Sequence, residues 1–275
     1  MLLTLTASCL KPMLLPEAKH RLAVEDLPRY AHEVLGLGGV NLTTDLLAGA
    51  DRTLLEGIRE RADKAACACL LLIEPEPLPF ASADRAEVKG AIDRMTRVVE
   101  AAHILGCSSA AVSIIAKDED LLLAKAADGL RKVVERAERL EINLLVSPHA
   151  GLTASADRVS DLIKRVGGFR IGTFPDFEAA AASDDPIGFL HRLTPYATVV
   201  SATTIKFVAK KGKGEEGDSL THKPYDLEPM IEAVRAVGYD GPLALDYRGT
   251  GDVTMGLTRS RDTIRRLLGE GDLQA

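Results

Sequence analysis

Eight short apolar runs, separated by longer amphipathic stretches, constrain this fold more than any other feature. Most of the runs are rich in Leu, Ile and Val, as strands buried on both faces are. Repeated strand–helix units predict a parallel sheet with right-handed crossovers. Eight such units in 275 residues predict a single α/β domain over 1–275, a closed (β/α)8 TIM barrel. The runs span 2–7, 40–43, 68–73, 110–115, 142–146, 170–174, 197–202 and 242–247.

An open doubly wound sheet is the alternative, but no run is followed by a Gly-x-Gly-x-x-Gly turn.

The segment 82–106 predicts a helix that starts with Ser82 as N-cap and ends at Gly106, and 227–241 predicts a helix closed by Gly238. The segment 210–218, KKGKGEEGD, predicts a flexible loop after the seventh strand. We expect the tail 269–275 to be frayed.

Composition narrows the location and the partners. The net charge of −6 and the aromatic share of 4% argue against a nucleic-acid partner, which rewards a basic face. No apolar stretch is long enough to span a membrane, and the start MLLTLTASCLKPMLLP lacks the basic segment of a secretion signal. The four cysteines show no metal or redox spacing, so we expect buried thiols in a reducing cytoplasm.

Titratable side chains follow several of the predicted strands. The active sites of such barrels lie at the carboxyl ends of the strands, where His149, Asp176 and Asp246 would meet. A histidine and two carboxylates can hold a divalent metal or share acid–base work. Alternatively, the aspartates cap the following helices and the histidine orients a neighbour. Glu74, after the third strand, is a further candidate base, with helix capping or a turn as its alternative.

Two long segments resemble a known family. The runs LLVSPHAGLTASADRVSDLIKRVGGFRIGTFPDF and PYDLEPMIEAVRAVGYDGPLALDYRG are similar to the xylose isomerase-like barrels classed as sugar phosphate isomerases/epimerases. The resemblance covers 140–270. It implies a sugar or sugar-phosphate ligand and a divalent metal, Mn²⁺ or Mg²⁺, held at the barrel mouth by side chains that follow strands five to eight.

The implied metal ligands are only partly present. Asp176 matches the family's aspartate and Asp246 replaces a glutamate, so these two would be the metal ligands. His149 matches a family histidine. Ser147 stands where a metal-binding glutamate is expected, and Ser201 or Ile205 where a histidine is expected. With two of four ligands lost, the resemblance implies weak metal binding or none.

Cationic residues gather after the last two strands. Arg248 stands where the family has a second glutamate, and Lys206 follows the seventh strand. We expect Arg248 and Lys206 to hold a phosphate or carboxylate of the ligand, with Ser147 and Ser201 completing the substrate-binding set. In the alternative, Arg248 pairs with Asp176 or Asp246 in place of the lost cation, and the loop lysines are solvated.

Three functions follow in order of support. The first is a sugar or sugar-phosphate isomerase/epimerase that transfers a proton next to a carbonyl, with metal dependence weakened or lost; its catalytic residues would be Asp176, Asp246, His149 and Glu74. The second is a non-catalytic descendant that binds a small anionic polyol or sugar acid, or an assembly subunit. The third, a metal-dependent abasic-site endonuclease, conflicts with the acidic charge and the few histidines. The sequence leaves the oligomeric state open, a homo-oligomer included.

Overall fold

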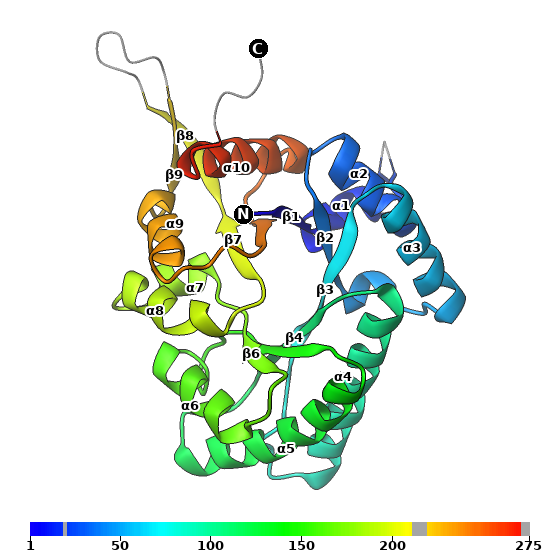
Figure 1. The fold of residues 1–275 in the computed structure, drawn as a ribbon, viewed down its shortest axis with the longest axis vertical. Helices are drawn as coiled ribbons and strands as arrows, with labels where there is room; N and C mark the ends of the chain where they lie inside the picture. Colours follow the sequence, from blue (N-terminus) through cyan, green and yellow to red (C-terminus); the bar gives the residue numbers. More distant parts are fainter. Residues whose placement is uncertain (19–20, 211–218, 271–275) are drawn as a thin grey trace.

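The computed structural model describes residues 1–18, 21–210 and 219–270, and its centre is a barrel of parallel strands (Figure 1). Eight strands form one sheet in the order β6-β5-β4-β3-β2-β1-β10-β7. Two isolated parallel bridges, Thr173 with Ala197 and Asp176 with Ser201, join the β6 edge to the β7 edge. The predicted TIM barrel is therefore confirmed. The strands are β1 (Leu3–Thr6), β2 (Gly39–Thr43), β3 (Ala68–Leu78), β4 (Ser109–Ile114), β5 (Asn143–Val146), β6 (Ile171–Thr173), β7 (Val200–Thr204) and β10 (Leu243–Tyr247).

Helices surround the sheet and bury their apolar faces against it (Figure 1). A smaller apolar cluster fills the inside of the barrel, with Leu71, Leu145 and Phe174 among its members. The inside of the barrel is thus a packed core. The helices are α1 (Lys11–Leu14), α2 (Leu27–Glu33), α3 (Arg52–Lys64), α4 (Arg85–Leu105), α5 (Asp120–Arg139), α6 (Ala156–Val166), α7 (Phe177–Ala181), α8 (Pro186–Leu193), α9 (Leu227–Ala236) and α10 (Val253–Leu267).

One helix boundary differs from its prediction. The N-cap of α4 is Asp84, whose Oδ1 accepts a hydrogen bond from Ala86 N at 2.7 Å, so Ser82 was the wrong N-cap. Ser82 instead accepts from Asp84 N at 3.0 Å and donates to Glu87 at 2.6 Å, which holds the turn before the helix. Gly106 ends α4 at a φ of +79°, as predicted.

A two-stranded antiparallel hairpin, absent from the prediction, follows β7. It consists of β8 (Lys206–Lys210) and β9 (Ser219–Lys223), which pair over their full lengths. The predicted flexible loop at 210–218 lies outside the described residues except for Lys210, and so do 271–275 of the predicted frayed tail. Within the described part of that predicted tail, Glu270 Oε1 lies 3.7 Å from the amino-terminal nitrogen.

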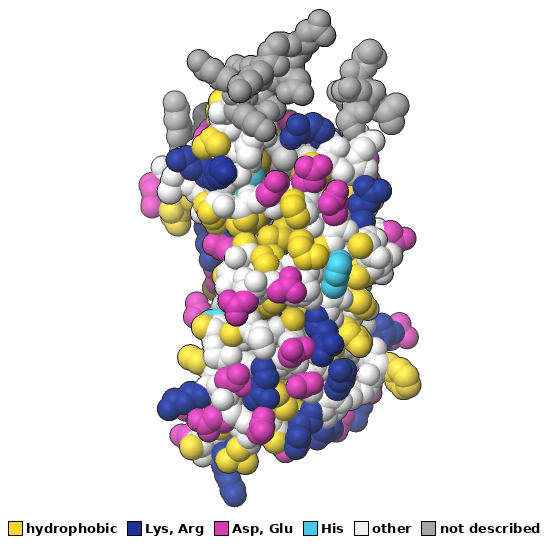
Figure 2. All heavy atoms as spheres, turned by 90° about the vertical axis from the view of Figure 1, so that its left-hand side faces the viewer, with side chains coloured by type: hydrophobic (Ala, Val, Ile, Leu, Met, Phe, Trp, Pro, Cys, Tyr) yellow, Lys and Arg dark blue, Asp and Glu magenta, His cyan; other side chains and the backbone are white. Residues whose placement is uncertain are grey.

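The described surface and interior bear on two further expectations. All four cysteines are buried free thiols, as predicted. Within the described ranges, no helix has both the length and the apolar character needed to cross a membrane. On the side of the molecule shown in Figure 2, basic and acidic side chains are interspersed around apolar ones.

Candidate functional site

A cavity of about 550 Å³ opens where the barrel strands end. Its apolar part includes Ile73 and Phe174, which belong to or pack against the cluster inside the barrel. Its polar part combines six hydroxyl groups with carboxylates and two cations. These residues are Thr6, Ser8, Lys11, Thr43, Glu74, Ser113, Ser147, Asp176, Glu178, Ser201, Asp246 and Arg248. A lining of hydroxyls and charges around an apolar floor suits a small polar ligand.

The guanidinium of Arg248 joins three carboxylates that line this cavity. Its Nη2 lies 3.0 Å from Asp176 Oδ2 and 2.7 Å from Asp246 Oδ2. Its Nη1 donates to Glu178 at the start of α7, and its Nε donates to Asp246 Oδ2 at 2.8 Å. Burial alone would lower the pKa of Arg248, but the charges of Asp176 and Asp246 raise it. The arginine is therefore the ion-pair partner of both aspartates, the second of the two predicted roles.

Asp176 has two tasks at the end of β6. Its Oδ1 accepts a hydrogen bond from Ala179 N at 2.9 Å, which makes it the N-cap of α7. Its Oδ2 pairs with Arg248 and accepts the hydroxyl of Thr203 from β7. The alternative role of Asp176 as a helix cap is therefore confirmed, while its role in binding or catalysis stays a prediction. The seam between β6 and β7 also places Ser201 here, because Ser201 N donates to Pro175 O at 2.8 Å.

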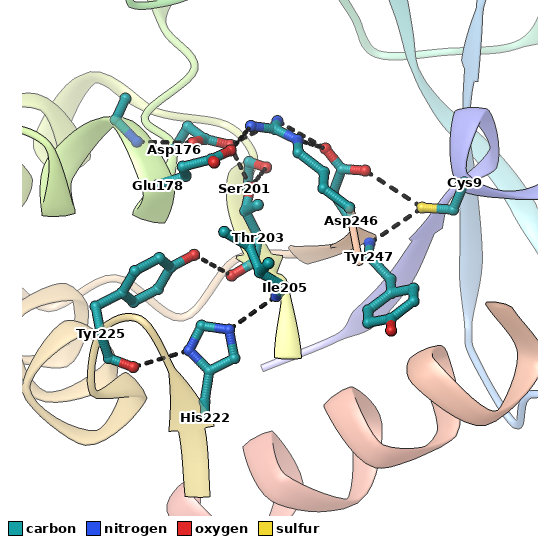
Figure 3. Close-up of polar contacts among 12 residues, drawn as sticks. Cys9, Asp176, Glu178, Ser201, Thr203, Ile205, His222, Tyr225, Asp246 and Tyr247 are labelled. Carbon is teal, nitrogen blue, oxygen red and sulfur yellow. Dashed lines mark hydrogen bonds and ion pairs between the residues drawn. The ribbon is translucent and has the colours of Figure 1, made fainter. Parts of the chain in front are cut away.

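Asp246 is buried at the end of β10, where only 8% of it is exposed. Burial raises the pKa of its carboxyl, and the charge of Asp176 adds to that rise, while Arg248 opposes it. The Cys9 thiol donates to Oδ1 at 3.2 Å, and Tyr247 N donates to Cys9 Sγ at 3.1 Å (Figure 3). Burial and the neighbouring Asp246 raise the pKa of Cys9, so it stays a protonated donor.

Glu74 supplies a carboxylate from β3, which β2 and β1 separate from β10 in the sheet. Only 3% of Glu74 is exposed, yet it lines the same cavity. Its Oε2 accepts from Arg94 Nε at 2.7 Å and from the hydroxyl of Thr44 at 3.0 Å. Arg94 and Thr44 fix the orientation of the carboxylate, and neither was singled out from the sequence.

The other residues predicted for the site, Ser147, His149 and Lys206, do not all lie at the barrel mouth. Ser147 lines the mouth cavity, whereas His149 does not; its backbone N donates to Thr153 O at 3.2 Å. Lys206 lines a second cavity of about 340 Å³, together with Arg248 and Arg259. Of the loop lysines, Lys211 and Lys213 lie outside the described residues.

His222 holds the hairpin against the end of β7, a role that the sequence did not reveal. Its Nε2 accepts from Ile205 N at 2.8 Å, so its Nδ1 carries the proton and donates to Tyr225 O at 2.8 Å. Tyr225 in turn donates to Thr203 O at 2.7 Å (Figure 3). Burial lowers the pKa of His222, which favours this neutral form.

The divalent metal implied by the resemblance does not fit these residues. Nη2 of Arg248 already lies between the carboxylates of Asp176 and Asp246. Ser147 and Ser201 offer hydroxyls where the family has an acid and a histidine, and His149 lies outside the cavity lining. Over the described ranges, no group of three or more His, Cys, Asp and Glu side chains is arranged to hold a metal ion.

Known proteins share this architecture at low sequence identity. No curated protein matches the chain in sequence. A D-psicose 3-epimerase from Clostridium cellulolyticum H10, solved with D-tagatose, superposes with a TM-score of 0.77 at 12% identity, over 98% of this chain and 99% of its own. The 3-keto-D-glucoside 4-epimerase YcjR from E. coli gives 0.72 at 14% identity, over 98% and 99%.

A third similar structure carries a metal. It is a xylose isomerase-like barrel protein from Mycobacterium smegmatis in complex with magnesium, with a TM-score of 0.65 at 16% identity, over 90% of this chain and 88% of its own. At these identities the superpositions show a shared fold. A family model described as xylose isomerase-like TIM barrel matches residues 28–268. The chain therefore belongs to the xylose isomerase-like TIM barrel family.

Proposed function

We propose that the protein binds a small sugar at the barrel mouth and interconverts its isomers or epimers by moving a proton at the carbon next to the carbonyl. One observation carries the proposal: Glu74 and Asp246, from separate strands, line one cavity whose wall is otherwise rich in hydroxyl groups. Carboxylates can remove and return a proton, while hydroxyls bind a polyol. The two sugar epimerases of the same fold support this choice of ligand.

Glu74 is the general base of this proposal. A serine hydroxyl is not a base near neutral pH, so Ser147 does not replace the glutamate expected at its position. Glu74 comes from β3 and makes no ion pair with Arg248, and Arg94 and Thr44 hold it in one orientation. Asp246 is the second carboxylate of the pair, and Arg248 and the Cys9 thiol hold it in place. Arg248 donors polarise oxygens of the bound sugar.

The charge of the cavity favours an uncharged sugar over a sugar phosphate. Four carboxylates line it, against the two cations Lys11 and Arg248. Lys11 lies 2.5 Å from Asp45, and Arg248 is already paired, so little positive charge is left for a phosphate. A phosphorylated sugar is the alternative. Its phosphate would have to reach the second cavity, beside Lys206 and Arg259.

Product analysis by NMR over a panel of free ketoses and aldoses and their phosphates tests the proposal. We expect turnover of at least one free sugar, and a loss of about 100-fold or more in Glu74→Gln, the usual contribution of a general base. Glu76→Gln is the matched control, because Glu76 is an exposed glutamate on the same strand and lies outside the cavity lining. If only phosphates react and Lys206→Ala abolishes their turnover, the uncharged ligand is wrong.

A non-catalytic sugar-binding protein is the second candidate. Each of the main carboxylates, Glu74, Asp176 and Asp246, forms an ion pair with an arginine. Carboxylates paired in this way are held as structural charges, which favours this second candidate. Such a protein would bind a panel member by calorimetry, with no product and no loss of affinity in Glu74→Gln. A cytoplasmic location is part of both proposals, since four unpaired thiols suit a reducing compartment.

A further inference from the structure

We infer that the guanidinium of Arg248 is the resident cation of this site and holds the carboxylates of β6 and β10 together in the place of a divalent metal ion. The inference concerns the cation alone. It stands or falls independently of the ligand and reaction proposed above, because its test uses no sugar.

The carboxylate oxygens converge on one nitrogen of this side chain. Oδ2 of Asp176 and Oδ2 of Asp246 both contact Nη2, at 3.0 and 2.7 Å. Glu178 contacts the other terminal nitrogen of the same guanidinium. The planar fork of an arginine can satisfy several carboxylates at once. Three acids, two at the start of α7 and one on β10, are therefore neutralised by one side chain.

The other oxygen positions of the two aspartates are also occupied. Asp176 Oδ1 accepts the capping N–H of Ala179, and Asp246 Oδ1 accepts the Cys9 thiol. Asp176 and Asp246 are 13% and 11% exposed at the side chain, so each needs a nearby counter-charge. A metal ion could bind between them only by displacing Arg248.

The backbone holds Arg248 in this position. Arg248 N donates to Thr204 O at 2.8 Å, which extends the pairing of β10 with β7. The next residue, Gly249, packs so closely on β7 that an added Cβ would lie 1.9 Å from Ile205 O. A glycine at 249 therefore lets the chain stay against β7 while Arg248 reaches across the mouth.

Calorimetric titration of the chelator-treated full chain with Mn²⁺ tests the inference. We expect no Mn²⁺ binding at this site in the wild type. Arg248→Ala should gain a site, and Arg248→Ala combined with Asp176→Asn should lose about tenfold or more of that affinity, the usual effect of removing a ligand. Arg94→Ala is the matched control: it frees the single carboxylate of Glu74 and should create no site.

Either of two results would overturn the inference. One is Mn²⁺ binding by the wild type that Asp176→Asn abolishes. The metal would then bind at Asp176 while Arg248 is present, so Arg248 would not stand in the place of a metal. The other is a folded Arg248→Ala variant that binds Mn²⁺ no more tightly than the wild type. If Arg248→Ala does not fold, Arg248→Gln, which keeps most of the stem without the charge, carries the same expectations.

Discussion

Replacing Asp176 by alanine should cost far more stability than the loss of a helix cap. Asp176 caps α7, accepts the hydroxyl of Thr203 and pairs with Arg248. A cap contributes about 1 kcal/mol, a hydrogen bond to a charged group about 1.5 kcal/mol, and a partly exposed ion pair about 0.5 kcal/mol. Relief of the repulsion between Asp176 and Asp246 offsets part of this. We expect a net loss of about 2–3 kcal/mol in the free energy of unfolding.

Asp185→Ala is the matched control for this experiment. Asp185 caps α8 through Gly188 N at 2.9 Å, and the described part of the chain offers it no ion pair. We expect it to lose only about 1 kcal/mol. Thermal unfolding by circular dichroism should show a melting temperature lowered by about 4–12 °C for Asp176→Ala and about 2–4 °C for Asp185→Ala. Equal shifts would show that Asp176 acts only as a cap, and that its contacts with Arg248 and Thr203 add nothing.

Three further predictions concern the hairpin, the barrel seam and the thiols. Burial lowers the pKa of His222, so its contribution to stability is present above the unfolded pKa of about 6.5 and is lost as pH falls through the folded value. The free energy of unfolding from urea titrations should therefore fall from about pH 7.5 to pH 5, by at most about 1.4 kcal/mol per pH unit. The fall should be less steep in His222→Gln, and parallel slopes for the two proteins would refute this. Gly172→Ala should destabilise the protein by about 1–3 kcal/mol, because the added Cβ would lie 2.4 Å from Tyr196 O. The control Gly57→Ala, which has open space around it in α3, should stabilise the protein by about 0.5–1 kcal/mol in the same assay. A neutral Gly172→Ala would mean that the β6–β7 seam is loosely packed. Burial raises the pKa of the Cys69 thiol to about 12 and also raises the pKa of Cys9. The thiols of the native protein should therefore resist a disulfide reagent at about pH 8 and react only after unfolding. Fast labelling of Cys9 would contradict this and show that the barrel mouth admits the reagent.

The order of strands and helices could be predicted because buried strands and amphipathic helices have distinct periodicities. The prediction failed where local chemistry decides. Asp84 and Ser82 are both good N-caps, and only the backbone shows that Asp84 starts α4. The hairpin β8–β9 escaped because its segments flank a glycine- and charge-rich run that resembles an unstructured loop.

The candidate site was predictable where one rule applies, namely that strand ends gather at the mouth. Glu74, Ser147, Asp176 and Asp246 all line the cavity for that reason. Partners from outside the strand ends were missed. Arg94 comes from a helix 20 residues beyond Glu74. Cys9 does lie at a strand end, but it was predicted only to be a buried thiol, whereas it contacts Asp246 of the neighbouring strand β10.

His149 shows the limit of reasoning from a motif. It stands where the family has a histidine, yet the turn after β5 bridges its backbone to Thr153, and it lies outside the cavity lining. The sequence gives the place of a residue along a strand, whereas the turn that follows decides where its side chain lies. The same limit applies to Lys206, which leaves the mouth because β8 turns away into the hairpin.

The most direct test of this account is solvent-deuterium exchange into a free sugar by the chelator-treated protein, followed by NMR. We expect deuterium to enter at the carbon next to the carbonyl, at a rate that added Mn²⁺ leaves unchanged and that Glu74→Gln lowers by about 100-fold or more. Exchange that appears only when Mn²⁺ is added, or that persists in Glu74→Gln, would contradict it.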